Sequence, residues 1–242
     1  MKAEILFPEV CNLYADVENI RYLHCCCPDL ETVETPLHAR PVFLDEDVSL
    51  VYMGSATEKG LMLAVETLLP YKEEIRAKID GGQLFLLTGN AMDAFSQGVD
   101  SDGAWHFDGL GLLPGRAQYT MMKRQNSFFL GTFDTVSGPM DIVGFKSLFG
   151  HTYGAPEGNA LFNTIRGTGR CPESKEEGFH IHNLMATHLI GPLLILNPPF
   201  TKYLMQLMGC ESTALAFETA AFGSYRHRVD EFHQESRSAF YS

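Results

Sequence analysis

The stretch LFLLTGNAM at residues 84–92 decides the fold, because an apolar run breaks abruptly into a short polar turn. Residues 84–87 are predicted to form a buried strand, and a short helix is predicted to begin after the turn. In α/β folds such a strand–turn–helix unit places the turn at the carboxyl edge of a sheet, where amidase and esterase nucleophiles lie. The turn itself, Thr-Gly-Asn at 88–90, carries neither cysteine nor serine.

Short apolar runs alternate with helical segments along the first half of the chain, which is the pattern of a sheet with crossover helices. Strands are predicted at residues 3–7, 30–35 and 48–53, and helices at 16–27, from 55 onward and at 71–79. Ser55 and Glu58 form a predicted capping box for the second of these helices. These elements predict an α/β fold whose central sheet is mostly parallel.

The second half is richer in β-structure, and its strands are predicted to be mostly antiparallel additions, at 127–135, 140–145, 160–165, 179–181 and 184–190. Asn197 and Pro198 predict a helix start, as an N-cap and a first-turn proline. We expect a single domain, residues 1–242, because no linker, repeat or low-complexity tract divides the chain. Residues 211–242 are predicted as a C-terminal extension, either a loosely packed helix or a partner-binding segment.

The composition excludes several classes of protein. Lys and Arg number 18 and Asp and Glu number 30, so the formal net charge is −12, and an acidic surface repels nucleic acid. The N-terminal sequence lacks the uninterrupted apolar core of a secretory signal, and no segment reaches the roughly 20 apolar residues that span a bilayer. We therefore expect a cytoplasmic protein with reduced cysteines that binds neither nucleic acid nor membrane.

Two groups of side chains, histidines and cysteines, are of the types that bind metals, but their spacing in the sequence is not that of a metal site. His180 and His182 point to one face of a predicted strand with His188 nearby, but no third ligand is evident. Consecutive cysteines at 25–27 on a helix point about 100° apart and cannot all reach one ion. We expect no metal and no cofactor, with the histidines hydrogen-bonded or at the surface and the cysteines buried in helical packing.

Six segments follow one another in a recognisable order and spacing: NLYADVENI (12–20), DGLGLL (108–113), IVGF (142–145), GHTY (150–153), EEGFHIHNL (176–184) and THLIGPLL (187–194). Together they resemble class I glutamine amidotransferases of the cobyric-acid-synthase type, in particular the glutaminase subunit of lipid II isoglutaminyl synthase. The resemblance runs from about residue 10 to 208 and implies a flavodoxin-like three-layer fold. It also implies a Mur-ligase-like partner, with which such a subunit amidates the glutamate of the cell-wall precursor.

The family's chemistry needs four elements, and by resemblance each falls on a changed position. The nucleophile of a Cys-x-Gly-x-Gln elbow matches Thr88, or Gly89 in a register shifted by one. The base of a Leu-His-Gly-Pro turn matches Ile190, and the glycine-rich oxyanion loop is reduced to Gly54. The Asn-His-Gly-Gly-Arg loop reads Ser-Leu-Phe-Gly-His at 147–151. The pocket candidates are Tyr52, Met53, Gly54, Gly89, Asn90, Met92, His151 and His188.

The pattern of changes predicts a subunit without glutaminase activity. A threonine hydroxyl with no neighbouring base is un-ionised at pH 7, and losing either member of a nucleophile–base pair costs about 10⁶ in rate. We expect the chain to bind a Mur-ligase-like partner. Two alternatives stay open: a working amidotransferase, in which His188 serves a nucleophile such as Cys171 or a cysteine at 25–27, and a module that binds a small ligand in the altered pocket.

Overall fold

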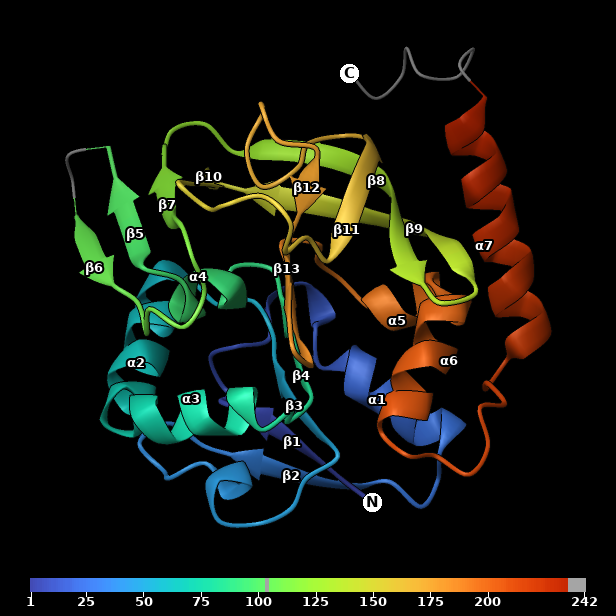
Figure 1. Cartoon of the computed structure of the whole chain (residues 1–242), viewed down its shortest axis with the longest axis horizontal. Coiled ribbons are helices and arrows are strands. Elements are labelled where there is room, and N and C mark those ends of the chain that lie inside the picture. The colour runs from blue at the N-terminus through green and yellow to red at the C-terminus, as the bar shows by residue number, and fades with distance from the viewer. Residues whose placement is uncertain (103–104, 235–242) are drawn as a thin grey trace.

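A six-stranded sheet forms the centre of the protein. The computed structural model describes residues 1–102 and 105–234, and its strands run in the order β13-β14-β4-β3-β1-β2 (Figure 1). Their bounds are β1 Lys2–Leu6, β2 Glu31–Thr35, β3 Leu50–Met53, β4 Phe85–Thr88, β13 Phe179–Ile181 and β14 Leu184–Thr187. All pairs are parallel except β13 with β14. The order β2-β1-β3-β4-β14 is that of flavodoxin-like folds, so the expected fold class is confirmed.

Helices cover both faces of this sheet, which gives three layers. Side chains alternate along each strand, so Leu50 and Tyr52 of β3 join one hydrophobic core while Val51 and Met53 join the other. The first face carries α1 Glu18–Cys26, α5 Leu193–Leu196 and α6 Pro198–Leu207, and the second carries α2 Glu58–Leu68, α3 Lys72–Asp80 and α4 Ala91–Phe95. Short 3-10 helices lie at η1 Leu13–Ala15, η2 Val42–Leu44 and η3 Leu69–Tyr71. The two cores hold β4 in the middle of the sheet and thereby fix the turn that follows it.

Two four-stranded sheets lie above the central sheet in Figure 1. One contains β10 Gly150–Tyr153, β7 Arg116–Tyr119, β5 Gly98–Ser101 and β6 His106–Asp108, and the other contains β12 Glu176–Glu177, β11 Phe162–Arg166, β8 Gln125–Thr135 and β9 Gly138–Leu148. Antiparallel pairing is confirmed for β8, β9 and β11. β14 is antiparallel to β13 on one side and parallel to β4 on the other. The sequence missed β5, β6, β7 and β10, because strands this short give too few residues for an alternating pattern.

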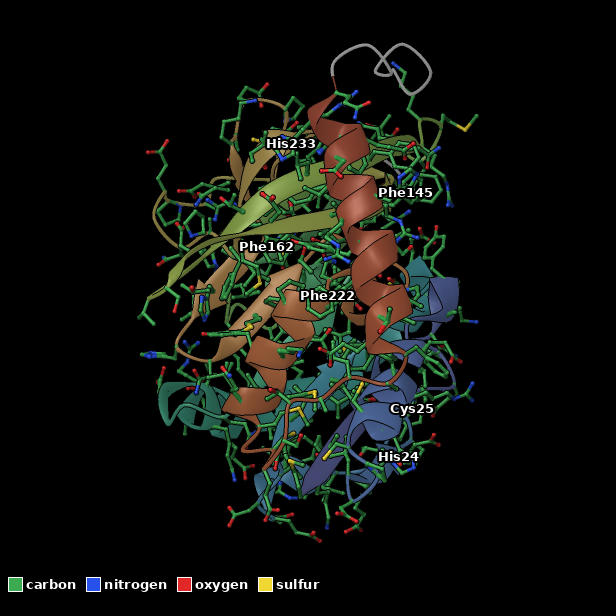
Figure 2. All side chains as sticks on the ribbon, turned by 90° about the vertical axis from the view of Figure 1, so that its right-hand side faces the viewer. His24, Cys25, Phe145, Phe162, Phe222 and His233 are labelled. Carbon is green, nitrogen blue, oxygen red and sulfur yellow. The ribbon has the colours of Figure 1, made fainter. Side chains whose placement is uncertain are left out.

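Helix α7, Glu218–His233, packs against the outer side of β8 and β9, as Figure 2 shows. The Tyr225 hydroxyl donates to the Asp141 carbonyl at 2.8 Å, and its ring packs with Leu130 and Val143. Much of the predicted extension 211–242 is therefore a helix docked on the domain, and residues 235–242 lie outside the described residues. No helix of the described residues is both long enough and apolar enough to cross a membrane.

Two predicted helix starts use their side chains differently from the prediction. Helix α2 is capped by Thr57, whose hydroxyl accepts a hydrogen bond from Gly60 N at 3.1 Å, so the predicted Ser55 cap is wrong. Asn197 does occupy the N-cap position of α6. Its side chain, however, accepts from Val143 N and donates to Val143 O, both at 2.8 Å, and so joins α6 to β9. Ser55 is left in the turn before α2, next to the end of β4.

Candidate functional site

The turn after β4 is an elbow with a glycine at its apex. Gly89 has φ +60°, a left-handed conformation that side chains with a Cβ rarely adopt. A Cβ placed on Gly89 would lie 1.9 Å from Ser55 Oγ and 3.1 Å from Ile190 Cγ2. Nucleophile elbows of α/β enzymes have this strained strand-to-helix geometry. Here the apex has no side chain, and Ser55 occupies the space into which one would point.

Ile190 lies beside the elbow at the end of the neighbouring strand. Gly89 N donates to Leu189 O at 3.1 Å, which holds the two turns together. The Ile190 side chain is 5% exposed and offers no proton acceptor. If Gly89 is the nucleophile position, it lies next to Ile190, the position at which the resemblance implies the base. Neither residue carries a titratable side chain.

Thr88 points into a buried hydrogen-bond network instead of the pocket. Its Oγ1 lies 2.8 Å from the Tyr52 hydroxyl, which in turn donates to the Asp16 carbonyl at 2.8 Å. Asn19 Nδ2 donates to the same Tyr52 oxygen at 3.0 Å. Because the Tyr52 proton is used on Asp16, the Thr88 hydroxyl acts as the donor in its bond to Tyr52. Burial, followed by the charge of Asp16, raises the pKa of Tyr52, so this network stays protonated.

The Asp16 carboxylate covers the turn after β3. Its Oδ2 accepts a hydrogen bond from Ser55 N at 2.7 Å. Gly54 makes this approach possible, because a Cβ there would lie 2.6 Å from the Asp16 Cβ. Burial raises the pKa of Asp16 to about 6. The Ser55 N–H, in the loop where the resemblance expects oxyanion donors, is thus already occupied by a carboxylate.

A pocket of about 110 Å³ opens in front of the elbow. Its wall includes Ser55, Asn90 and Ile190 from the turns described above. Asn90 is held rigidly, because it accepts from Ala56 N at 2.9 Å and donates to Ala56 O at 2.8 Å. The rest of the wall comes from η1, from the start of α2 with Glu58, from the segment 147–150 where β9 leads into β10, and from the side chains of Asp93, Tyr119 and Arg124.

Arg124 is the cationic side chain on this wall. Its Nη1 donates to the Tyr14 hydroxyl at 2.6 Å and lies 3.3 Å from Ser147 Oγ, and its guanidinium lies 4.4 Å from the centre of the Phe149 ring. These contacts orient the guanidinium without neutralising it, because no carboxylate of the described residues forms an ion pair with Arg124. Tyr14 itself has φ +59°, an uncommon conformation for a tyrosine.

His188 is buried behind the pocket and bound to an aspartate. Its Nε2 lies 3.1 Å from Asp93 Oδ1, and Tyr119 donates its hydroxyl proton to Asp93 Oδ2 at 2.6 Å. His188 N also donates to the buried Glu177 carboxylate at 2.8 Å. The histidine is 1% exposed and does not belong to the pocket wall, whereas Asp93 and Tyr119 do.

The other predicted pocket residues are scattered. Met53 and Met92 are fully buried in the core on the α2 side, and Tyr52 is buried on the α1 side. His151 Nε2 hydrogen-bonds to Gln125 Oε1, and burial lowers the pKa of this imidazole. Ser55 and Ile190 therefore narrow the pocket, and Met53 and Met92 do not belong to its wall.

The histidines and cysteines that have the chemistry of metal ligands do not form a cluster. His182 lies 3.8 Å from Asp80, while the His180 ring packs against Phe133. Among the described residues no three His, Cys, Asp or Glu side chains are arranged to hold a metal ion. The prediction that the cysteine triplet is buried in helical packing is wrong for Cys25, which is exposed. Cys26 and Cys27 are half-buried and pack against the hydrophobic core on the α1 side.

Sequence reasoning missed the polar residues that organise the site: Asp16, Asn19, Ser55, Asp93, Tyr119 and Arg124. The segment NLYADVENI contains two of them and was recognised only as scaffold. A usable signal was the pair of polar residues at 16 and 19, which fall on one side of a predicted helix start and lead toward the carboxyl edge of the sheet.

Comparisons with known proteins agree with the fold. No family model matches the chain. Over 212 residues, 86% of this chain and 83% of the relative, it is 26% identical to the lipid II isoglutaminyl synthase (glutamine-hydrolyzing) subunit GatD of Staphylococcus aureus (strain N315). The fold is similar to that of PurLQS from Thermotoga maritima, with a TM-score of 0.54 and 13% identity over 94% of this chain and 98% of that chain. It is also similar to a solved glutamine amidotransferase, with a TM-score of 0.55 and 13% identity over 85% of this chain and 98% of that chain. The chain is therefore glutamine-amidotransferase-like and related to GatD.

A side chain at the elbow apex should destabilise the fold by two separate effects. Gly89→Ala combines a left-handed backbone with the contact to Ser55, whereas Gly209→Ala has φ +82° and no atom within 4 Å of the added Cβ. We expect Gly209→Ala to lower the free energy of unfolding by about 1 kcal/mol and Gly89→Ala by at least about 2 kcal/mol. Urea titration measures both. Adding Ser55→Gly should recover part of the Gly89→Ala loss, and equal losses for the two alanine variants would contradict the crowded apex.

Proposed function

We propose that the chain is an amidotransferase-like subunit of the cobyric-acid-synthase type that does not hydrolyse glutamine and binds a Mur-ligase-like partner. The observation that carries this proposal is the elbow, where Gly89 stands at the apex and Ile190 lies 3.1 Å from the position of its missing Cβ. Acyl transfer from glutamine by this fold needs a nucleophile and a base in contact. Gly89 and Ile190 supply neither.

The side chains around the elbow support the same proposal. The Thr88 hydroxyl is hydrogen-bonded to the Tyr52 hydroxyl. The Asp16 carboxylate accepts the Ser55 N–H and would repel the developing oxyanion of a tetrahedral intermediate at that position. His188 is bound to Asp93 through Nε2 and is separated from the pocket. A replacement base at His188 is therefore not favoured by the geometry.

The relationship with GatD, which is one subunit of a synthase, supports the partner role. The relative is described as a subunit of a glutamine-hydrolyzing lipid II isoglutaminyl synthase, and the alignment covers most of both chains. The proposal is that this chain has kept the docking surface of such a subunit together with its scaffold. Binding, not ammonia supply, is then the function on which this chain depends.

A glutamine-analogue diazoketone should leave the protein unmodified. Such electrophiles alkylate an activated nucleophile, and the loss of a nucleophile–base pair costs about 10⁶ in rate. Intact-protein mass spectrometry should show no adduct after a time in which the staphylococcal subunit, as positive control, is fully labelled. A stoichiometric adduct on any residue of this chain would overturn the proposal.

The combined variant Gly89→Cys, Ser55→Gly and Ile190→His provides the matched control. It clears the space at the apex and restores a thiol and an imidazole in contact, so we expect it to take up the label at the introduced thiol. Circular dichroism establishes that it is folded. A folded variant that stays unlabelled would count against Gly89 as the nucleophile position.

The partner can be tested separately from the chemistry. Mixed with the Mur-ligase-like protein of the same organism at micromolar concentrations, the chain should co-elute with it in size-exclusion chromatography with light scattering. The combined variant Gly89→Cys, Ser55→Gly and Ile190→His, once shown to be folded, should bind equally well, because the proposal separates docking from the chemistry at the elbow. Separate elution of the two proteins at these concentrations would contradict the partner role.

A second candidate function is the binding of a small anionic ligand, and Arg124 is the observation that favours it. The guanidinium lies on the pocket wall, stacked on Phe149 and oriented by Tyr14, with no carboxylate of the described residues paired to it. An oriented, unpaired arginine in a concave site recognises a carboxylate or phosphate in a bidentate manner. The pocket would then act as a sensor instead of a catalytic site.

Thermal-shift measurements with small carboxylates and phosphates test this candidate. A ligand at 100 times its dissociation constant adds about 2.7 kcal/mol to the stability of the folded state, which raises the melting temperature by several degrees. Arg124→Gln should abolish the shift, whereas Arg21→Gln, at an exposed arginine paired with Glu18, should not change it. An unchanged shift in Arg124→Gln would exclude this site.

A further inference from the structure

The short helix η1, which forms part of the pocket wall, has a strained backbone. Tyr14 and Ala15 both have left-handed conformations, with φ +59° and +58°. Two consecutive left-handed residues are costly when both carry a Cβ, because the Cβ crowds the following carbonyl oxygen. Strain of this kind collects at ligand clamps and switch regions. Contacts outside its own backbone must therefore hold η1 in this conformation.

Packing contributes little to holding η1. None of its residues is buried, and Leu13 and Tyr14 are 37% and 40% exposed. The backbone is anchored at both ends of the loop. Leu13 N donates to Ser55 O at 3.0 Å, and Val17 N donates to Asn12 Oδ1 at 3.0 Å. Between these two bonds, the tip of the loop depends on one contact of the Tyr14 side chain.

That contact joins η1 to the connection between β7 and β8. Arg124 Nη1 donates to the Tyr14 hydroxyl at 2.6 Å, and both residues line the pocket. Because the Tyr14 oxygen is the acceptor, its own proton is available, and no acceptor for it lies among the described residues. Arg124 Nε and Nη2 likewise have no partner in the part of the chain that the structure describes. One hydroxyl proton and one edge of a guanidinium are thus available to the same ligand.

We propose that η1 is a lid that closes over a small carboxylate in the pocket, with the Tyr14 hydroxyl as one of the groups that bind it. The carboxylate accepts the unpaired N–H groups of Arg124 and the hydroxyl proton of Tyr14, while Arg124 Nη1 keeps its bond to the Tyr14 oxygen. Hydrogen bonds to an ionised acceptor are roughly twice as strong as neutral ones, so a bound carboxylate offsets the backbone strain of the closed lid. This assignment rests on the second candidate function, the binding of an anion at Arg124.

The other charged side chains of the pocket favour a ligand with a single negative charge. Glu58 and Asp93 also line the wall. Their negative charges repel a doubly charged phosphate more strongly than a monocarboxylate, and this repulsion is larger in a concave, partly buried site than in water. Acetate is therefore expected to close the lid more effectively than inorganic phosphate.

Hydrogen exchange of the full chain, resolved by NMR, tests the lid without any ligand. Three amides of the loop are hydrogen-bonded in the closed conformation: those of Leu13, Asp16 and Val17. Tyr14→Phe removes the bond to Arg124 and should raise the exchange rates of these amides about tenfold. The amide of Gly89, bonded to Leu189 O, should keep its rate. Unchanged exchange of the loop amides in Tyr14→Phe would overturn the lid.

Tyr153→Phe is the matched control, because the Tyr153 hydroxyl has no hydrogen-bond partner among residues 1–102 and 105–234. It should leave the exchange of the loop amides unchanged. Faster exchange of these amides in Tyr153→Phe, equal to that in Tyr14→Phe, would contradict a specific role of the bond to Arg124.

Acetate and inorganic phosphate, each compared with chloride at equal ionic strength, test the ligand. Acetate should slow the exchange of the loop amides, phosphate should do so less, and Tyr14→Phe should bind acetate at least about tenfold more weakly in an NMR titration. Equal acetate affinity in Tyr14→Phe and the unchanged chain would overturn the role of Tyr14 while leaving anion binding at Arg124 intact. No protection by either anion would overturn the lid as a binding device together with the second candidate function.

Discussion

The backbone of Gly89 packs against Ser55 and Ile190, and the rest of the site depends on this contact. At φ +60° the apex can approach Ser55 so closely that an added Cβ would overlap its hydroxyl. The bond from Gly89 N to Leu189 O fixes the distance between the ends of β4 and β14. With that spacing fixed, the hydroxyl of Ser55 and the aliphatic side chain of Ile190 border the pocket beside the elbow apex.

The buried polar residues behind the elbow stabilise this closed arrangement. Asp16 binds the turn after β3, Asn19 and Tyr52 connect that turn to β4, and Asp93 holds His188 and Tyr119 on the other side. Each of these side chains makes at least one hydrogen bond within the protein, which lowers the cost of burying it. Asp16 Oδ1 and His188 Nδ1 have no hydrogen-bond partner among the described residues. The hydrogen bonds of these polar side chains thus support the fold of the elbow.

The sequence predicted the strands of the central sheet and most of its helices but could not determine the register of the elbow. An apolar run followed by Thr-Gly-Asn announces a turn after a strand, yet only the backbone conformation shows that Gly89, and not Thr88, stands at the apex. The hydrogen bonds that link Asp16 and Asn19 to Tyr52 were not predictable, because they join residues more than 30 positions apart. Arg124 was missed for a similar reason, since its contacts to Tyr14 and Phe149 come from separate loops.

The most direct test of the central claim uses glutamine labelled with ¹⁵N at the side-chain amide. NMR follows the release of labelled ammonia by the purified chain, alone and together with the proposed Mur-ligase-like partner. The account predicts that the labelled ammonium signal grows no faster than in buffer, in either mixture. Labelled ammonium that accumulates in proportion to the concentration of this chain would contradict it, because a nucleophile and a base would then have to meet at the end of β4.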